Sequence, residues 1–214
     1  MLIRRQQGVS LIEVIIGIAL LAMLMAMGVP QYSIFLANAR LRATAESIST
    51  GLSLARAEAV KRNARVEMVL TDEEPIEGLV NAVPPQPDGI NWMVREFVPR
   101  TGAYNFIEGK SGAEGSGKQD LTTTAMRVQV ASTGTGIYSG IVMFTGFGGV
   151  GAETIAGSSQ TVTYRITNPA GGLCVTAGGP MRCLNIIVSP GGQVRTCDPA
   201  IPVANVTDTR VCPP

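Results

Sequence analysis

The sequence has no histidine and few charged or aromatic side chains, and these shortages exclude much chemistry. Of the 214 residues, 15% are charged and 5% are aromatic. Without histidine, a zinc site would need cysteine or carboxylate ligands alone, and a Ser-His-Asp triad cannot form. The chain also lacks the G-x-S-x-G and G-x-x-x-x-G-K-[ST] motifs and any recognisable frame of paired carboxylates. We therefore expect no enzyme activity, no metal and no cofactor.

Residues 146–151, GFGGVG, match the G-x-G-x-x-G pattern of dinucleotide-binding folds. That pattern binds a pyrophosphate where its third glycine opens a helix. Here AETIAGSSQ and a predicted strand follow, and no acidic residue lies about 20 positions further on to hold a ribose. Residues 146–151 are therefore interpreted as a turn between strands.

Charge is distributed unevenly along the chain. Residues 40–65 carry six basic and two acidic groups, whereas residues 66–214 carry nine basic and thirteen acidic groups, a net of −4. An acidic globular part is a poor general binder of nucleic acid. Any contact with DNA would need a local basic patch.

The N-terminus combines a short polar leader, residues 1–8, with an apolar segment, residues 9–30, in which Glu13 is the one charge. A helix of about 21 apolar residues spans a hydrocarbon core of about 30 Å. Arg4 and Arg5 would keep the leader in the cytoplasm and direct the rest to the periplasm. A secretory signal peptide would have a shorter apolar run. A simple uncleaved anchor leaves the costly Glu13 and the boundary residue Gly8 unexplained.

Gly8 followed by VSLIEV resembles the prepilin peptidase site of type IV pilins and type II secretion pseudopilins. The resemblance implies cleavage after Gly8 and methylation of Val9, although the usual first residue is phenylalanine. It also implies that Glu13 pairs with the N-terminal ammonium of a neighbouring subunit, since two charges that are costly to bury singly are tolerated as a pair. Pro30 is interpreted as a helix kink.

The same resemblance implies the partners and the location of the protein. Expected partners are the prepilin peptidase, the inner-membrane assembly platform, and other minor and major pilins. The protein would first be a single-pass protein of the bacterial inner membrane with a periplasmic head, and then a subunit of a pilus or pseudopilus filament.

An amphipathic helix is predicted for residues 31–65, which would continue the apolar segment into one helix of about 55 residues. Its apolar stripe recurs at steps of three and four residues and comprises Leu41, Ala45, Ile48, Leu52, Ala55 and Ala59. LSLARAEAVKRN, residues 52–63, resembles the FimT/GspH branch of the pilin superfamily. The expected fold class is α+β, with a long N-terminal helix packed on an antiparallel β-sheet head, residues 66–214.

Seven strands are expected in the head from short apolar runs and alternation. They are residues 66–70, 90–98, 125–130, 137–144, 161–167, 184–189 and 193–197. Residues 71–90 are expected to form a loop, and residues 110–120, a low-complexity stretch, are expected to be mobile.

All four cysteines lie in the C-terminal region, residues 174–214. An even number of cysteines in a Gly/Pro-rich tail indicates two disulfides and an oxidising compartment, rather than four reduced thiols in the cytosol. Three pairings are possible. The short local loops favour Cys174 with Cys183 and Cys197 with Cys212.

VSPGGQVRTCDP, residues 188–199, resembles the C-terminal ends of FimT- and FimU-type minor pilins. In the FimT branch a Gly-Arg-x-Arg stretch is associated with DNA binding, because two guanidiniums can hold successive phosphates. This chain has Gln193 in place of the first arginine and keeps Arg195, with Arg182 and Arg210 as further candidates. We expect a minor pilin that is incorporated into the type IV pilus or primes its assembly. A GspH-class pseudopilin and a DNA-binding minor pilin are the alternatives.

Overall fold

The computed structural model describes residues 10–112, 127–132, 140–151, 161–205 and 207–213. The chain forms two compact units, residues 1–36 and residues 37–214. Each unit is described by itself below. One helix, α1 (Leu11–Arg62, 52 residues), contributes to both.

The ends of α1 are defined by backbone hydrogen bonds. The amides of Glu13 and Val14 donate to the carbonyl of Ser10, at 3.1 and 3.3 Å, in the first turn. After Arg62 the chain turns at Asn63, whose φ of 47° lies in the left-handed region that commonly ends helices. Lys61 and Arg62 occupy the last turn, where cations interact favourably with the helix dipole.

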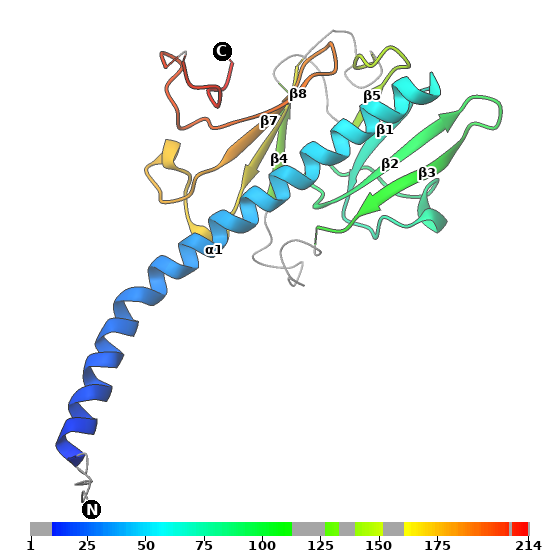
Figure 1. Ribbon diagram of the computed structural model, residues 1–214. Coiled ribbons are helices and arrows are strands. Elements are labelled where there is room, and N and C mark those ends of the chain that lie inside the picture. The colour runs from blue at the N-terminus through cyan, green and yellow to red at the C-terminus, as the bar shows by residue number, and fades with distance from the viewer. Residues whose placement is uncertain (1–9, 113–126, 133–139, 152–160, 206, 214) are drawn as a thin grey trace, which may run out of the picture. The chain divides into compact units, whose positions relative to one another are not determined.

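The described residues of the second unit form two antiparallel sheets of four strands each (Figure 1). The first sheet has the order β3-β2-β1-β5. Its strands are β1 (Val66–Thr71), β2 (Asn91–Val98), β3 (Ala103–Lys110) and β5 (Ile141–Phe144). The second sheet has the order β4-β6-β7-β8. Its strands are β4 (Arg127–Ser132), β6 (Val162–Thr167), β7 (Leu184–Val188) and β8 (Val194–Cys197). Short 3₁₀ helices comprise Glu77–Leu79, Pro169–Gly171 and Val175–Ala177.

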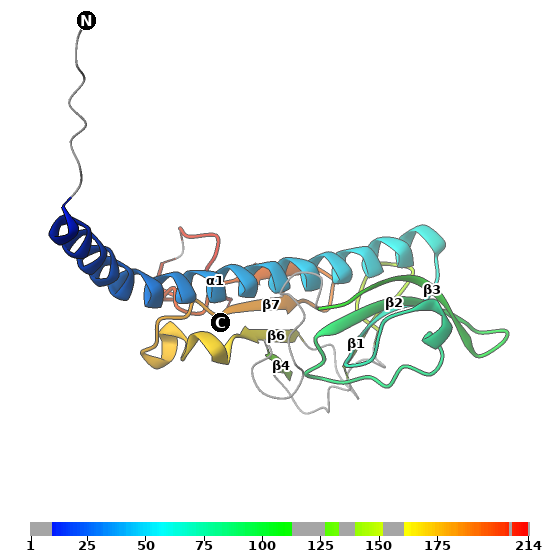
Figure 2. The same cartoon turned by 90° about the horizontal axis from the view of Figure 1, so that it is seen from below.

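The second half of α1 lies across both sheets (Figure 2). Each of the six residues of the predicted apolar stripe is at most 1% exposed. The indole of Trp92 in β2 lies against Gly51 and donates a 2.9 Å hydrogen bond to the Ser47 hydroxyl. Directly after β6 of the second sheet, the side chain of Asn168 donates to the carbonyl of Ala37 at 3.3 Å. The core of the head therefore forms between α1 and the two sheets.

The outer face of the first sheet carries a second, smaller core. Val69 of β1 and Met93 of β2 pack there against Val80 and Val83 from the β1–β2 connection. Glu67 and Arg95, which face each other across β1 and β2, form a buried ion pair beside this cluster, with 2.7 Å between Oε1 and Nε. The connection between β1 and β2 thus covers the sheet instead of projecting into solvent.

The α+β fold class is confirmed, and the head contains two sheets where one was expected. All seven predicted strands have counterparts among β1, β2 and β4–β8. The structure adds β3, which the sequence analysis missed. The beginnings of the predicted strands 125–130 and 137–144, and most of the stretch 110–120, lie outside the described residues.

Candidate assembly surface and C-terminal arginine cluster

The first half of α1 presents large apolar side chains to its surroundings. In Leu11–Met25 the exposed fractions of these side chains run from 49% at Val14 to 77% at Leu11. The set comprises Leu11, Ile12, Val14, Ile15, Ile16, Ile18, Leu20, Leu21, Met23, Leu24 and Met25. A helix that is apolar on every side is normally buried by other elements, other chains or lipid.

Glu13 is an exposed residue in the first turn of this apolar segment. Gly8 and Val9 lie outside the described residues. Pro30 lies within α1, and the kink expected there stays a prediction. In the part of the chain that the structure describes, no helix is long and apolar enough to cross a membrane.

The C-terminal end of α1 is tied to β2 by charged side chains. Glu58 accepts hydrogen bonds from Arg62 at 2.7 Å and Lys61 at 3.0 Å, and these bonds lower the pKa of its carboxyl group. Arg62 also pairs with Glu96 of β2 at 2.8 Å. The lateral position of the helix end is thereby fixed on the first sheet.

The C-terminal region contains two disulfides, Cys174–Cys183 and Cys197–Cys212. These are the two pairs that the short sequence separations favoured. The first closes a loop between β6 and β7, and the second ties the end of β8 to the tail. An isolated bridge between Asp198 and Val211 continues the tail beside β8.

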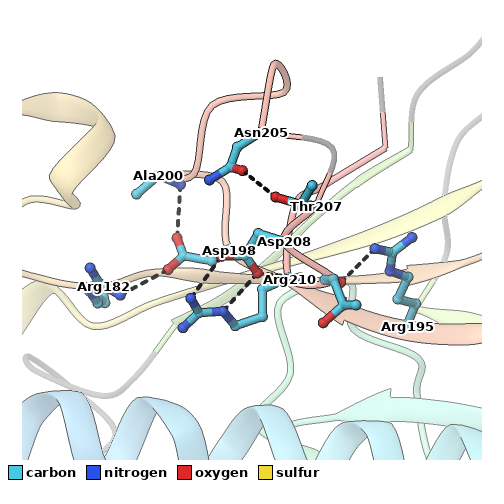
Figure 3. A network of polar contacts seen from close by, with 9 residues as sticks. Arg182, Arg195, Asp198, Ala200, Asn205, Thr207, Asp208 and Arg210 are labelled. Atoms are coloured by element: carbon cyan, nitrogen blue, oxygen red, sulfur yellow. Dashed lines mark hydrogen bonds and ion pairs between the residues drawn. The ribbon is translucent and has the colours of Figure 1, made fainter.

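The three candidate arginines for DNA binding all contact the C-terminal region itself (Figure 3). Arg195 of β8 donates to the carbonyl oxygens of Thr209 and Val211, at 2.6 and 3.2 Å. Arg210 forms two hydrogen bonds to the carboxylate of Asp208, at 3.0 and 2.8 Å. These bonds lower the pKa of Asp208 to about 2.

Arg182 is held less tightly than the other two arginines. Its Nη1 lies 3.5 Å from Oδ2 of Asp198, and its side chain is 56% exposed. Asp198 is buried, and its Oδ1 accepts a 2.9 Å hydrogen bond from the amide of Ala200. The pair connects the two disulfide loops, because Arg182 precedes Cys183 and Asp198 follows Cys197 (Figure 3).

The residues of the Gly192–Arg195 stretch contact two different parts of the protein. Gly192 has a φ of 77°, and a Cβ there would collide with the carbonyl oxygen of Gly148, so only glycine fits. Gln193, together with Arg56 and Lys61 of α1, lines an open surface pocket of about 540 Å³. Arg195, by contrast, is directed to the tail. Gln193 and Arg195 stand where the Gly-Arg-x-Arg motif has its two arginines. Because they face different surroundings, they do not form one paired cationic site.

The sequence places Asp198 and Asp208 in the same region as Arg182 and Arg210, but sequence reasoning missed the acceptors of Arg195. Asp208-x-Arg210 is a local spacing that the sequence displays. The carbonyls of Thr209 and Val211 give no such signal, because any residue supplies a backbone carbonyl. Asp198 is visible in the CDP ending, but its burial is a consequence of tertiary packing.

Comparisons with known proteins give the family of the chain. Residues 3–29 match the prokaryotic N-terminal methylation motif, and residues 44–192 match the family of the type II transport protein GspH. The second match covers more than half of the chain, and the chain belongs to this family of type IV pilin-like proteins.

The chain is also similar to two solved structures. Two crystal structures of the type IV minor pilin FimU from Pseudomonas aeruginosa, in space groups P21 and P65, are each 14% identical to the chain with a TM-score of 0.44. The alignments cover 72% of this chain and 86% and 90% of the FimU chains. No curated protein matches the chain.

Proposed function

We propose that the chain is a minor pilin that is cleaved after Gly8, methylated at Val9, and incorporated into a type IV pilus or used to prime its assembly. Before assembly, residues 9–30 anchor it in the bacterial inner membrane, with the head in the periplasm. In the filament, the same helix packs against the helices of other minor and major pilins.

The exposed apolar surface of Leu11–Met25 is the observation that carries this proposal. Eleven large apolar side chains in 15 residues are about half exposed or more. Burial of apolar surface contributes about 25 cal/mol per Å², so such a helix is driven strongly into lipid or against other helices. The two environments succeed each other in a pilin, because the subunit leaves the bilayer when it enters the filament.

Glu13 is the feature that distinguishes assembly from simple anchoring. A carboxylate within an apolar segment is costly, and the cost is offset when an opposite charge meets it in the same apolar surroundings. Cleavage after Gly8 would create such a charge four residues away, at the Val9 ammonium. In a filament, the ammonium of one subunit and Glu13 of another can pair.

The disulfides support a periplasmic head. Both bonds join cysteines in the same C-terminal region, and the described residues contain no free cysteine. Disulfides persist in oxidising compartments such as the bacterial periplasm.

Processing at Gly8 is the first testable prediction. Mass spectrometry of purified filaments should find a mature chain that begins at N-methylated Val9. Gly8→Arg should leave the precursor in the membrane, because the peptidase needs a small residue beside the bond it cuts. Gly17→Ala, a change in the same apolar segment with no atom near the new Cβ, is the control and should be processed normally. A chain that still begins at Met1 in assembled filaments would contradict the proposal.

A role in type II secretion is the second candidate, and the GspH family match favours it. A pseudopilin uses the same processing and the same helix packing in a different filament. Deletion of the gene separates the two roles. Loss of pili with normal secretion supports the pilus, whereas loss of secretion with normal pili supports the pseudopilus.

DNA binding during transformation receives less support from the geometry. Arg182 and Arg210 pair with aspartates, and Arg195 binds backbone carbonyls of the tail. A phosphate would have to displace these partners. Loss of transformation with normal piliation in an Arg195→Ala variant would nevertheless point to DNA binding.

A further inference from the structure

We infer that the loop closed by Cys174–Cys183 is a membrane-contacting surface of the head, whose Leu173 and Val175 enter the interfacial layer of the bilayer before assembly. The inference rests on the proposed membrane anchoring and adds a second, peripheral contact to it. The surface that the loop contacts is the periplasmic face of the lipid bilayer.

Leu173 and Val175 are exposed on a loop that is otherwise firmly built. Their exposed fractions are 66% and 43%. The disulfide fixes the base of the loop, and backbone hydrogen bonds join it internally: Met181 donates to Leu173 at 3.1 Å, and Val175 donates to Met181 at 2.8 Å. Met181 itself is fully buried. The backbone therefore holds the two apolar side chains outward in a fixed position.

The loop is attached to the part of α1 that enters the head. The amide of Arg182 donates to Oδ1 of Asn38 at 2.9 Å, and a Cβ on Gly171 would lie 2.9 Å from the Cβ of Ala37. The segment 169–183 accordingly lies beside the first turns of the head's helix in Figure 2. Leu173 and Val175 are thus at the end of the head where the chain arrives from the apolar segment.

Chain length keeps this end of the head close to the membrane. Val29 ends the apolar run, and Ala37 is eight positions further on. Even a fully extended chain cannot separate the two by more than about 29 Å. The loop therefore lies at the end of the head that is nearest along the chain to the segment held by the bilayer.

The charges near the loop suit a lipid surface. Arg42 is exposed, and it follows Asn38 by one helical turn, on the side of α1 that meets the loop. Arg182 is 56% exposed but pairs with Asp198, so among the described residues Arg42 supplies the uncompensated basic charge beside the loop. Apolar side chains beside basic ones form the pattern of surfaces that bind anionic membranes. Residues 37–65 of the head carry a net charge of +4, and residues 66–214 carry −4.

Tryptophan fluorescence in vesicles tests the contact. The full chain is reconstituted into vesicles of phosphatidylethanolamine and phosphatidylglycerol, with and without bromine atoms on the acyl chains. Leu173→Trp places a reporter on the loop. Phe147→Trp is the matched control, because Phe147 is 97% exposed and its neighbour Gly148 packs on Val60. Val60 is 23 residues beyond Ala37 on α1, about 35 Å along a helix. Both variants keep the buried Trp92 as a constant background.

The inference predicts that the added emission of Leu173→Trp shifts to shorter wavelength in vesicles and loses most of its intensity when the lipids carry bromine. The emission of Phe147→Trp should not change. Unquenched Leu173→Trp emission in a chain that floats with the vesicles would overturn the inference and leave the anchoring intact. A shift that is the same with and without brominated lipid and that grows with the amount of protein per vesicle would show that the loop contacts another subunit. This result would also overturn the inference. A chain that fails to float would overturn the proposed anchoring, and this inference with it.

Discussion

Glu67 and Arg95 form an ion pair whose two side chains are at most 8% exposed. The guanidinium of Arg95 is surrounded on three sides. It donates to Glu67 at 2.7 Å and to the carbonyl of Val80 at 2.6 Å, and its Cζ lies 3.9 Å from the centroid of the Tyr104 ring. The pair links β1, β2, β3 and the connection that covers them. A buried charge of this kind is tolerated only while its partners are present.

Removal of the carboxylate should therefore destabilise the head. We expect Glu67→Ala to lower the free energy of unfolding by about 3 kcal/mol, because Arg95 is left buried with only neutral partners. Lys61→Met is the control, because Lys61 is 72% exposed and its pair with Glu58 should contribute less than about 1 kcal/mol. The measurement is urea unfolding of the detergent-solubilised chain, followed by the emission of Trp92. Equal losses in the two variants would contradict this account of the pair.

Some single residues were predictable from sequence and others were not. The disulfide partners followed from short spacing, and the glycine at 192 was part of a recognised stretch. Arg195 was a candidate for phosphate binding on the sequence alone. The structure gives it two backbone carbonyl acceptors of the tail. The fold of the tail, which brings these carbonyls to β8, leaves no mark in the pattern of residues.

At the scale of elements, α1 packs closely on β2 through one small residue. A Cβ added at Gly51 would lie 3.0–3.1 Å from three atoms of the Trp92 ring. Glycine inside a helix usually costs about 1 kcal/mol relative to alanine. Here it permits the helix to approach the indole, whose Nε1 is held by Ser47.

Gly51→Val should accordingly displace Trp92. The branched side chain adds methyl groups beyond the Cβ, so we expect a loss of about 1–3 kcal/mol from overpacking and a shift of Trp92 emission to longer wavelength. Gly17→Val is the matched control on the same helix, where nothing lies within 4 Å of the new Cβ. Unchanged emission and stability in Gly51→Val would show that the contact is looser than described.

Helices and strands whose apolar residues recur at a regular spacing were predicted well. The helix stripe and the alternation of Val162, Tyr164 and Ile166 in β6 correspond to side chains that are at most 1% exposed. β3 was missed although Tyr104 and Phe106 alternate in it. The available signal was the preceding turn, where Gly102 adopts a φ of 66° between β2 and β3. Division into two sheets could not be predicted, because β1 pairs with β5 about 75 residues away, and local patterns do not specify such a partner.

At the scale of the whole molecule, two units have opposite surface character. The first exposes an apolar helix segment that is unsuited to water, and the second is a disulfide-linked head in which 15 basic and 15 acidic groups balance. This division suits a protein that moves from one apolar environment to another while its head stays in water. Membership of the GspH family and the methylation motif agree with such a life cycle.

Glu13 is proposed to drive incorporation into the filament, and the amount of a Glu13→Ala variant in sheared filaments measures this effect. If α1 only anchors the head, loss of a costly carboxylate should be harmless. If Glu13 meets the Val9 ammonium of a neighbour, the variant leaves that ammonium unpaired, at a cost of roughly 3–5 kcal/mol. Glu46→Ala, a change at an exposed acidic residue of the same helix, is the control. We predict normal processing and membrane levels for both variants, with Glu13→Ala severely depleted from sheared filaments. Wild-type incorporation of Glu13→Ala would contradict the account.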